Sequence, residues 1–475
     1  MEANTNSEIK VTEEILDFIL QADIQHFPQQ VIQQGKHCLL DGMGVILSGS
    51  TAACSVILRD FIKSLRGVSE ATVLGRGAMR VPASLAALAN GTSGHAMDFD
   101  DTQLSTSPDR IFGLLTHPTI PPLAASLAVG ERTRASGLEF LEAFLTGFEV
   151  ECKIAEAIDP SHYAKGFHTS GTIGTFGATA SAAKLMGLEK AQVAKALGIA
   201  ASLASGIRVN FGTMTKPLHV GRAAENGVVA SDLASRGFSA DMQALDGPWG
   251  FFQVFGGGYA PEKIVGCLGN PHTIVDPGIS VKPYPCGVLG HPSMDAMLKL
   301  MLEHNLRPEQ IQAIRLKAGS NLIKPLRYGK AKNALEAKFS LPFMLSSIAV
   351  RRRAGVKEFT DEFVQSQPVQ RMMDKVEIVF DPEIEAKGFD KIRSVVEVRL
   401  QDGQCLVQAA DEKYRGGPER PFTSIDLHQK FEECAESVLQ ADDMRRAIAL
   451  IESVDQLASI EELVEVLAAS NDFDC

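Results

Sequence analysis

The sequence predicts a mostly α-helical protein, in which a large all-helical domain carries an inserted, smaller α+β lid domain. Up to about residue 265, long stretches place apolar residues at i, i+3, i+4 and i+7, as amphipathic helices do. Runs typical of β-strands gather between about 275 and 410, and the tail returns to helical spacing. Because both ends are helical, we predict one all-helical domain of residues 1–274 and 411–475, and a lid domain of residues 275–410.

The predicted helices of the larger domain are rich in small residues. They include "PASLAALANGTSGHAMDF", "GTIGTFGATASAAKLMGLEKAQVAKALGIAASLASG" and "HVGRAAENGVVASDLASRG". Alanine and glycine on helix faces let helix axes approach closely. We therefore expect a tightly packed bundle of many antiparallel helices.

The lid begins after a stretch rich in glycine and proline at 266–287. Predicted strands cover 311–319, 375–381 and 394–410, and the last of these contains a hairpin signal at Asp402-Gly403. Helical stretches such as "MDAMLKLMLEHN" and "FSLPFMLSSIAVRRRAG" lie between them. Strands and helices mixed in this way predict an α+β unit.

Composition narrows the class of partner. The 475 residues carry a net charge of −12, and no run of basic residues exceeds the "RRR" at 351–353, so we expect neither nucleic acid nor a membrane as partner. The eight cysteines form no C-x-x-C pair, and the N-terminus is acidic without an apolar segment, so we expect a cytoplasmic protein without a disulfide framework. No phosphate loop, dinucleotide fingerprint or G-x-S-x-G motif occurs, and therefore we predict no cofactor.

The stretch "HAMDFDDT" at 95–102 concentrates carboxylates at the end of a predicted helix. It is compatible with a charged turn whose side chains cap the backbone, or with a carboxylate used for proton transfer. A metal site is a third interpretation, but the D-x-D-D spacing lacks the glycine and glutamate of a calcium loop. The pattern by itself does not choose between the first two.

Two further stretches place titratable residues beside predicted helix starts. "SHYAKGFHTSG" holds Tyr163 and His168 ahead of a helix whose free N–H groups suit a carboxylate ligand. In "GTMTKPLH", Pro217 disfavours α geometry at Lys216 and predicts a turn into a helix. An exposed lysine is the ordinary alternative, but the small residues around Lys216 favour a buried base or anion clamp.

The boundary between the two predicted domains carries a fourth group. "VKPYPCGVLGHPSMDA" contains Lys282, Cys286 and His291 in a segment stiffened by proline. Ligand sites favour domain interfaces, so we predict that these side chains bind the substrate. Cys286 would be a nucleophile only with a histidine beside it.

Taken together, these stretches resemble the MmgE/PrpD family over most of the chain. The resemblance rests on five motifs in the family's order: "NGTSGHAMDFDDT", "GFHTSGTIGTFGA", "GTMTKPLHVGRAAENGV", "KPYPCGVLGHPSMDA" and "EAKFSLPF". Known members include a 2-methylcitrate dehydratase, a cis-aconitate decarboxylase and an iminodisuccinate epimerase, which act on small di- or tricarboxylates without metal or organic cofactor. The resemblance implies a homodimer with its active site in the cleft between helical domain and lid.

Carried over residue by residue, the resemblance assigns roles to particular side chains. The family's decarboxylases imply that Asp98, His168 and Lys216 are catalytic and that Thr102 binds the substrate. His117 corresponds to the histidine that follows the aspartate motif and is therefore also expected to be catalytic, although fourteen residues separate it from Thr102 where the decarboxylases have only a few. We expect this stretch, 103–116, to influence which acid is accepted.

Two other positions bear on the reaction type. Gly287 occupies the position at which the animal decarboxylases carry a lid histidine, which weakens the likeness to them. Tyr163 and Lys216 correspond to the residues that flank the substrate in the epimerase, where an acid and a base must face opposite sides of one carbon.

We therefore predict a cofactor-independent lyase that acts on a small di- or tricarboxylate, by proton transfer or decarboxylation beside a carboxylate. Such chemistry needs cations and donors aimed at the developing negative charge, together with an acid or base that works near neutral pH. Epimerisation and dehydration remain alternatives. A carboxylate-binding protein without activity is a fourth hypothesis, which the intact Asp98, His168 and Lys216 disfavour.

Overall fold

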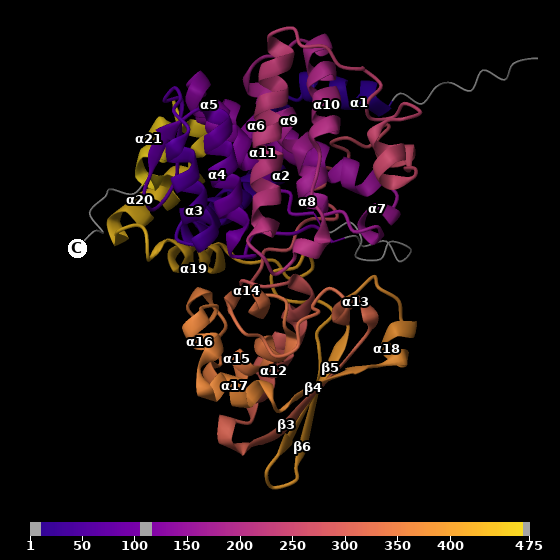
Figure 1. Cartoon of the computed structure of the whole chain (residues 1–475), viewed down its shortest axis with the longest axis vertical. Coiled ribbons are helices and arrows are strands. Elements are labelled where there is room, and N and C mark those ends of the chain that lie inside the picture. The colour runs from indigo at the N-terminus through magenta and orange to yellow at the C-terminus, as the bar shows by residue number, and fades with distance from the viewer. Residues whose placement is uncertain (1–10, 105–115, 469–475) are drawn as a thin grey trace, which may run out of the picture.

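The computed structural model describes residues 11–104 and 116–468. Helices form one end of the molecule, and a four-stranded sheet with its own helices forms the other (Figure 1). The predicted fold class, mostly α with a smaller α+β part, is confirmed. Most of the stretch 103–116, which we expect to influence substrate choice, lies outside the described residues.

The N-terminal part is a bundle of buried helices. They are α1 (Val11–Gln21), α2 (Gln29–Gly49), α3 (Ala53–Ser64), α4 (Ala83–Ala96), α5 (Ile120–Thr133), α6 (Gly137–Ala157), α7 (Ser161–Ala164), α8 (Thr169–Thr172), α9 (Gly174–Leu185), α10 (Lys190–Leu203) and α11 (Thr215–Ser235). The sequence predicts only helices here, but β1 (Ala71–Val73) and β2 (Met79–Val81) form a small antiparallel sheet. Strands of three residues are too short for an alternating pattern to be recognised.

Helices α4 and α11 pack closely because glycines lie where their axes meet. A Cβ atom added to Gly91 would lie 2.9 Å from the Cα atom of Gly221. A Cβ atom on Gly221 would overlap the hydroxyl of Thr92, at 2.1 Å. The end of α4 and the start of α11 are thereby placed side by side, and these are the two segments that carry Asp98 and Lys216.

The lid is built on a mixed sheet in the order β4-β3-β5-β6. Its strands are β3 (Ile311–Ala318), β4 (Val376–Phe380), β5 (Ser394–Leu400) and β6 (Cys405–Ala409). β4 runs parallel to β3, β5 is antiparallel to β3, and β5 and β6 form the hairpin predicted around Asp402-Gly403. In β5, Val396 and Val398 point into the lid core, which satisfies the alternating pattern of a half-buried strand.

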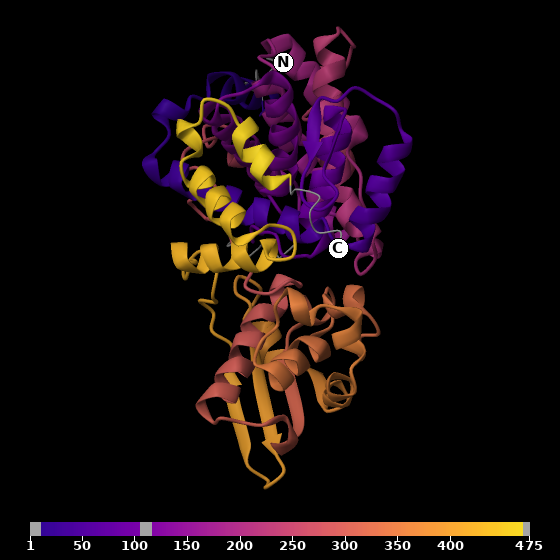
Figure 2. The ribbon, with the colours of Figure 1, turned by 90° about the vertical axis from the view of Figure 1, so that its left-hand side faces the viewer.

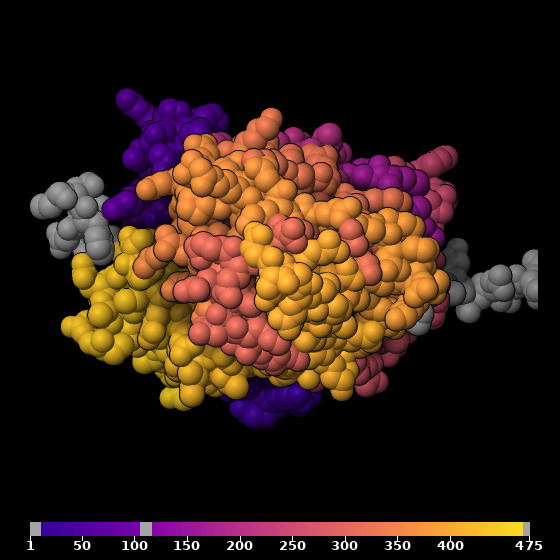
Figure 3. Space-filling view, turned by 90° about the horizontal axis from the view of Figure 1, so that it is seen from below, coloured from indigo at the N-terminus to yellow at the C-terminus, as the bar shows by residue number. Residues whose placement is uncertain are grey.

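Helices of the lid lie against this sheet and between it and the helical part (Figure 1). They are α12 (His291–Glu303), α13 (Ser320–Ile323), α14 (Ala334–Ala337), α15 (Leu341–Arg351), α16 (Asp361–Gln365), α17 (Gln367–Met373) and α18 (Pro382–Ala386). Seen from the lid end, the lid covers the middle of the molecule and the C-terminal segment lies along one edge (Figure 3).

After the lid, the chain returns to the helical part as α19 (Ser424–Ala435), α20 (Ala441–Glu452) and α21 (Glu461–Leu467) (Figure 2). Phe431 and Leu427 of α19 pack into the core that α2 and α6 also form. Two segments join the parts. Thr102 and Ser280 exchange both backbone hydrogen bonds, and the N–H of Val281 donates to the carbonyl of Gly416 at 2.9 Å.

Within the described residues, no single helix combines the length and the apolar character needed to cross a membrane. Helices α2 and α3 pass such a test of length and composition only together, and they are bent by 79° at the break between them.

Candidate active site

A left-handed turn follows helix α4 and directs the carboxylate of Asp98. The backbone of Asp98 has φ of +54°, a conformation that residues other than glycine adopt rarely, aspartate and asparagine among them. The side chain is buried, and its Oδ1 lies 2.7 Å from Nζ of Lys216 and 3.3 Å from Nζ of Lys282. One carboxylate is therefore shared by two lysines that come from different parts of the chain.

Lys216 lies in the first turn of α11, which begins at Thr215. The expectation that Pro217 keeps Lys216 out of helical geometry is wrong, because Lys216 lies within the helix. The steric effect of a proline on the preceding residue only disfavours this conformation, and a proline in the first turn takes no hydrogen bond from the helix. The lysine is buried, and its Nζ lies 5.2 Å and 5.5 Å from the ring centroids of Phe211 and Phe339. Burial lowers the pKa of Lys216 below its usual value, although Asp98 opposes the shift.

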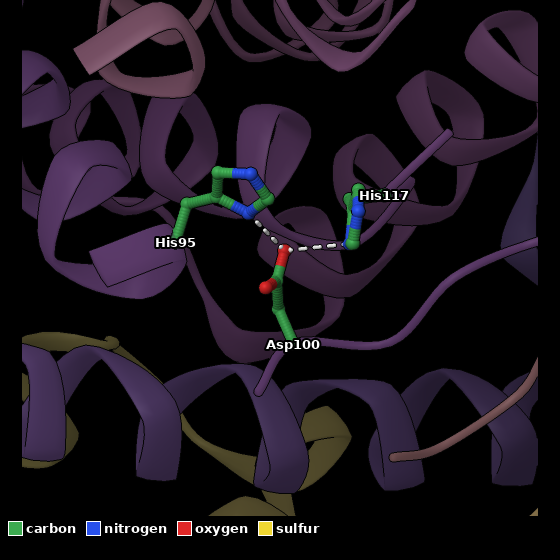
Figure 4. Close-up of side chains that lie close together, drawn as sticks. All are labelled: His95, Asp100 and His117. Carbon is green, nitrogen blue, oxygen red and sulfur yellow. Dashed lines mark hydrogen bonds and ion pairs between the residues drawn. The ribbon is translucent and has the colours of Figure 1, made fainter. Parts of the chain in front are cut away.

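Asp100 joins two histidines, His95 and His117 (Figure 4). Its Oδ2 lies 2.8 Å from Nδ1 of His95 and 3.1 Å from Nδ1 of His117. Nδ1 of His117 also lies 2.8 Å from the carbonyl oxygen of Asp101. Since these partners are acceptors, both Nδ1 atoms carry a proton and donate it.

This tautomer leaves Nε2 of His95 as an acceptor. Nζ of Lys216 lies 2.6 Å from that atom and donates to it. Burial lowers the pKa of His95 to about 3, so its ring is neutral near pH 7. A chain of hydrogen bonds thus runs from Asp100 through His95 to Lys216 and on to Asp98.

Asp98 and Asp100 are both held in the charged form. Burial alone would raise the pKa of Asp98, but Lys216 and then Lys282 outweigh this and hold it below its usual range. Burial would also raise the pKa of Asp100, but the electrostatic attraction of His95 and then of His117, together with the hydrogen bonds from both rings, holds it well below the usual value. The neighbouring Asp101 differs, because burial and then the charge of Asp41 raise its pKa to about 8.

Among the described residues, His95, Asp100 and His117 also have donor atoms within 4.8 Å of one another, which is close enough to hold a metal ion. A metal would need unprotonated nitrogens, whereas both Nδ1 atoms direct their protons at Asp100. In this arrangement, the three side chains are joined by hydrogen bonds.

His168 lies at the start of α8, and Tyr163 lies on α7. Nδ1 of His168 is 3.1 Å from Nδ1 of His219, so one ring donates to the other. Burial holds the pKa of His168 well below its usual value and that ring is neutral near pH 7. The guanidinium of Arg208 stacks over the Tyr163 ring at 3.6 Å, and burial raises the pKa of the Tyr163 hydroxyl, which stays protonated.

One cavity between the helical part and the lid brings most of the predicted site residues together. Its lining from the helical part comprises Asp98, Thr102, His117, Tyr163, His168, Phe211 and Lys216. The lid side contributes Lys282, Gly287, Val288, Leu289, Pro325, Leu326 and Phe339. Seven of the nine residues that the sequence analysis selects therefore line this cavity. Thr102 lines the cavity, but its hydroxyl proton is not free to bind a substrate, because Oγ1 donates to the carbonyl of Thr116 at 2.9 Å.

The two remaining predicted residues lie behind the wall. Cys286 is buried with its Sγ 3.8 Å from Sδ of Met294, and burial raises the pKa of the thiol well above its usual value. Nε2 of His291 donates to the backbone carbonyl of Cys286 at 3.1 Å, and His291 is fully buried. Neither side chain lines the cavity, and we leave both out of the proposed site.

Several residues in or beside the cavity were not selected from the sequence. His95 stands in the "HAMDFDDT" motif, but a histidine at a helix end is ordinarily structural, and its partner Lys216 is 121 positions away. Phe339 stands in the family motif "EAKFSLPF", and this motif could have identified Phe339 as a residue near the site. Leu326 and Phe211 carry no chemical signature, and only the fold places them here.

The fold and site define a helical protein with an α+β lid and a buried lysine, carboxylate and histidine cluster between them. The MmgE/PrpD N-terminal domain model matches residues 13–263 and the MmgE/PrpD C-terminal domain model matches residues 284–456. The chain belongs to the MmgE/PrpD family, as the sequence motifs predict.

Curated relatives match almost the whole chain. A cis-aconitate decarboxylase of Homo sapiens is 28% identical over 467 residues, covering 96% of this chain and 94% of the relative. A mouse cis-aconitate decarboxylase is also 28% identical, and one from Aspergillus terreus is 25% identical over 486 residues, with 97% of that relative covered.

Proposed function

We propose that this protein is a cofactor-independent lyase that releases CO₂ from cis-aconitate or a closely similar unsaturated tricarboxylate. The observation that carries the proposal is the buried ammonium group of Lys216, held between Asp98 and His95 at the wall of a cavity between two parts of the molecule. The relatives named cis-aconitate decarboxylase support this choice among the family's reactions.

The chemistry asks for cations on one side of the cavity. When a CH₂-bound carboxylate leaves as CO₂, the electron pair of the broken C–C bond moves into the neighbouring C=C and onto the carboxylate conjugated with it. One proton then adds to the carbon beside that carboxylate, so that one proton is consumed for each CO₂ released. Lys216 and Lys282 supply the positive charge that stabilises the developing dianion, and the hydroxyl of Tyr163 supplies a donor to a carboxylate.

Lys216 is the residue to which we assign the proton transfer. The Nδ1–H groups of His95 and His117 donate to Asp100, and both rings are neutral. Their Nε2 atoms therefore carry no proton and can accept one but not donate one. The ammonium of Lys216 donates one hydrogen to His95 and one to Asp98, which leaves a third for the substrate. Its lowered pKa makes it a stronger acid than an exposed lysine.

The lid supplies the apolar side of the cavity. Val288, Leu289, Leu326 and Phe339 bring no hydrogen-bonding side chain to the substrate. Such a wall keeps water away from the carbanion and strengthens the attraction between Lys216 and the substrate's charge.

The proposal is tested by incubating the purified full chain separately with cis-aconitate, 2-methylcitrate and iminodisuccinate. We expect CO₂ release from cis-aconitate and uptake of one solvent deuteron into the product in D₂O. Loss of water from 2-methylcitrate, or inversion of iminodisuccinate with deuterium uptake, would replace the proposal by dehydration or epimerisation. Binding of cis-aconitate without turnover of any of the three would leave only a carboxylate-binding function.

We also propose that the chain forms a homodimer. Between residues 207 and 254, seven large apolar side chains among the described residues are exposed: Ile207, Val209, Met214, Phe238, Met242, Trp249 and Val254. Trp249 is 91% exposed, and large aromatic side chains and methionine are enriched at contact sites between proteins. Light scattering after gel filtration is expected to give twice the mass of one chain, and a single-chain mass would contradict the proposal.

A further inference from the structure

Three buried lysines converge on the backbone of the turn that carries Asp98. Nζ of Lys338 donates to the carbonyl of Ala96 at 2.7 Å, Nζ of Lys282 to that of Asp98 at 2.9 Å, and Nζ of Lys430 to that of Phe99 at 2.8 Å. All three side chains are at most 6% exposed. Three of four successive residues beginning at the end of α4 are thus held by ammonium groups.

The turn needs such support for two reasons. Ala96 ends α4, and the last carbonyls of a helix have no partner within the helix and carry partial negative charge. Asp98 adopts a left-handed backbone conformation that an L-residue keeps only when its surroundings enforce it. Without the lysines, buried carbonyls would lack donors and Asp98 would be free to relax to a commoner conformation.

The three lysines come from three separate segments of the chain. Lys430 lies on α19, Lys282 on the segment leading into the lid, and Lys338 in the lid between α14 and α15. Lys430 also pairs with Asp41 of α2 at 2.5 Å. Among the described residues, Lys338 has no carboxylate within ion-pair distance. The ammonium group of Lys338 is therefore held by its hydrogen bond to the carbonyl of Ala96.

We propose that Lys338 and Lys430 are positioning residues, which together with Lys282 clamp the turn and hold the carboxylate of Asp98 against Lys216. Lys282 and Lys338 belong to the segments that form the lid. Contact between the lid and the helical part is therefore coupled to the alignment of Asp98. A lid that lifts would withdraw Lys338 from Ala96 and release the turn. The catalytic part of this inference rests on the proposed function, whereas the structural part does not.

Lys338 does not bind the substrate itself in this arrangement. It is absent from the residues that line the cavity, where its neighbour Phe339 forms the wall. Its Nζ is 2.7 Å from the carbonyl of Ala96. Loss of Lys338 therefore acts through Asp98 and Lys216, and this distinguishes it from loss of a substrate-binding cation.

Lys338→Met is the variant that separates these roles, since it removes the donor and leaves no carboxylate unpaired. We expect kcat with cis-aconitate to fall about 10-fold or more while KM changes less than about 3-fold, as for a group that acts on alignment rather than on binding. Lys338→Arg keeps a donor and a charge and should recover most of kcat. In a crystal structure of Lys338→Met, Asp98 should leave the left-handed region or lose its contact with Lys216.

Lys375→Met is the matched control. Nζ of Lys375 donates to the carbonyl of Ile311 at 2.6 Å in the lid sheet, so this variant also removes a lysine-to-carbonyl hydrogen bond, but outside the cavity lining. Its kcat should match that of the unaltered protein. An equal loss of kcat in both variants, a rise in KM alone for Lys338→Met, or an unchanged Asp98 in its crystal structure would each overturn the inference.

A crystal structure of the Lys338→Met variant tests the clamp even if the protein shows no turnover. If the unaltered protein releases no CO₂, the proposed function fails, while the conformation of Asp98 in Lys338→Met still decides the clamp. For Lys430, the double variant Lys430→Met/Asp41→Asn avoids leaving Asp41 as an unpaired buried charge. Its kcat should fall in the same way, and a kcat equal to that of the unaltered protein would remove Lys430 from the clamp.

Discussion

The two walls of the cavity differ in kind. The helical wall presents Asp98, His117, His168 and Lys216, whose polar atoms are tied to other buried side chains or to the backbone. The lid wall presents Val288, Leu289, Pro325, Leu326 and Phe339, with Lys282 as its charged member. One wall carries the chemistry in a fixed network, and the other supplies the dry surroundings in which that network is effective. Substitutions on one wall at a time test this difference.

The largest effect is expected on the helical wall at Lys216 and His168. Lys216→Ala and His168→Ala should each lower kcat by at least ~100-fold if they take part in proton transfer, because each removes a titratable group from the lining of the cavity. Steady-state CO₂ release measures the loss. Lys36→Ala is the matched control, since Lys36 is also a buried lysine in an ion pair, with Asp455 at 2.7 Å, but lies outside the cavity lining. Near-normal rates in both site variants would remove these residues from the mechanism.

Asp100 should come next, although it does not touch the cavity. Asp100→Asn replaces the shared acceptor by an amide, whose NH₂ group can face one of the two Nδ1–H donors. If His95 then moves its proton to Nε2, it can no longer accept from Lys216, and kcat should fall about 10- to 100-fold with little change in KM. A rise in KM with unchanged kcat would argue for a role in binding instead.

On the lid wall the effects should be smaller. Leu326→Ala opens space beside the substrate and admits water, which weakens the electrostatic stabilisation, so we expect kcat/KM to fall by about 3- to 10-fold. Leu302→Ala is the control, because Leu302 is an exposed leucine on α12 of the same lid. A loss of 100-fold at Leu326 would mean that the lid takes part in the chemistry and that the contrast between the walls is wrong.

How far the sequence leads depends on the kind of feature. The change from helical to alternating spacing predicts the lid sheet, and all its strands form at the expected places because their faces are half-buried. The sequence analysis selects seven residues that line one cavity. The exact domain boundaries at 274/275 and 410/411 and the catalytic roles remain predictions.

What the sequence could not predict are contacts between distant segments. His95 and Lys216 are 121 positions apart, and Lys338 and Ala96 are 242 apart. Their pairing depends on the close packing of α4 against α11 and on how the lid lies on the turn. Cys286 and His291 show the opposite case, because their polar side chains suit a site while the fold turns them into the core.

The smallest effect on turnover is expected at Asp101, the neighbour of Asp100. Its carboxyl is buried, one oxygen accepts from Thr119 at 2.8 Å, and its pKa is raised to about 8. In the unfolded chain the pKa of an aspartate is near 3.9, so between about pH 4 and pH 8 the unfolded state releases a proton that the folded state retains. Folding then binds a proton, and the contribution of Asp101 to stability falls as the pH rises through this window.

Asp101→Asn removes this penalty and keeps an oxygen for Thr119, while the backbone carbonyl that His117 uses is unchanged. The variant should gain about 1 kcal/mol relative to the unaltered protein near pH 5, and the gain should grow by up to about 1.4 kcal/mol for each further pH unit up to about pH 8. Its kcat should stay within about 2-fold of the unaltered value. Unfolding temperatures at several pH values measure the gain. A gain that does not grow with pH would mean that Asp101 is ionised in the folded protein. The carboxyl of Asp101 would then be a second charged group behind the helical wall rather than a neutral one.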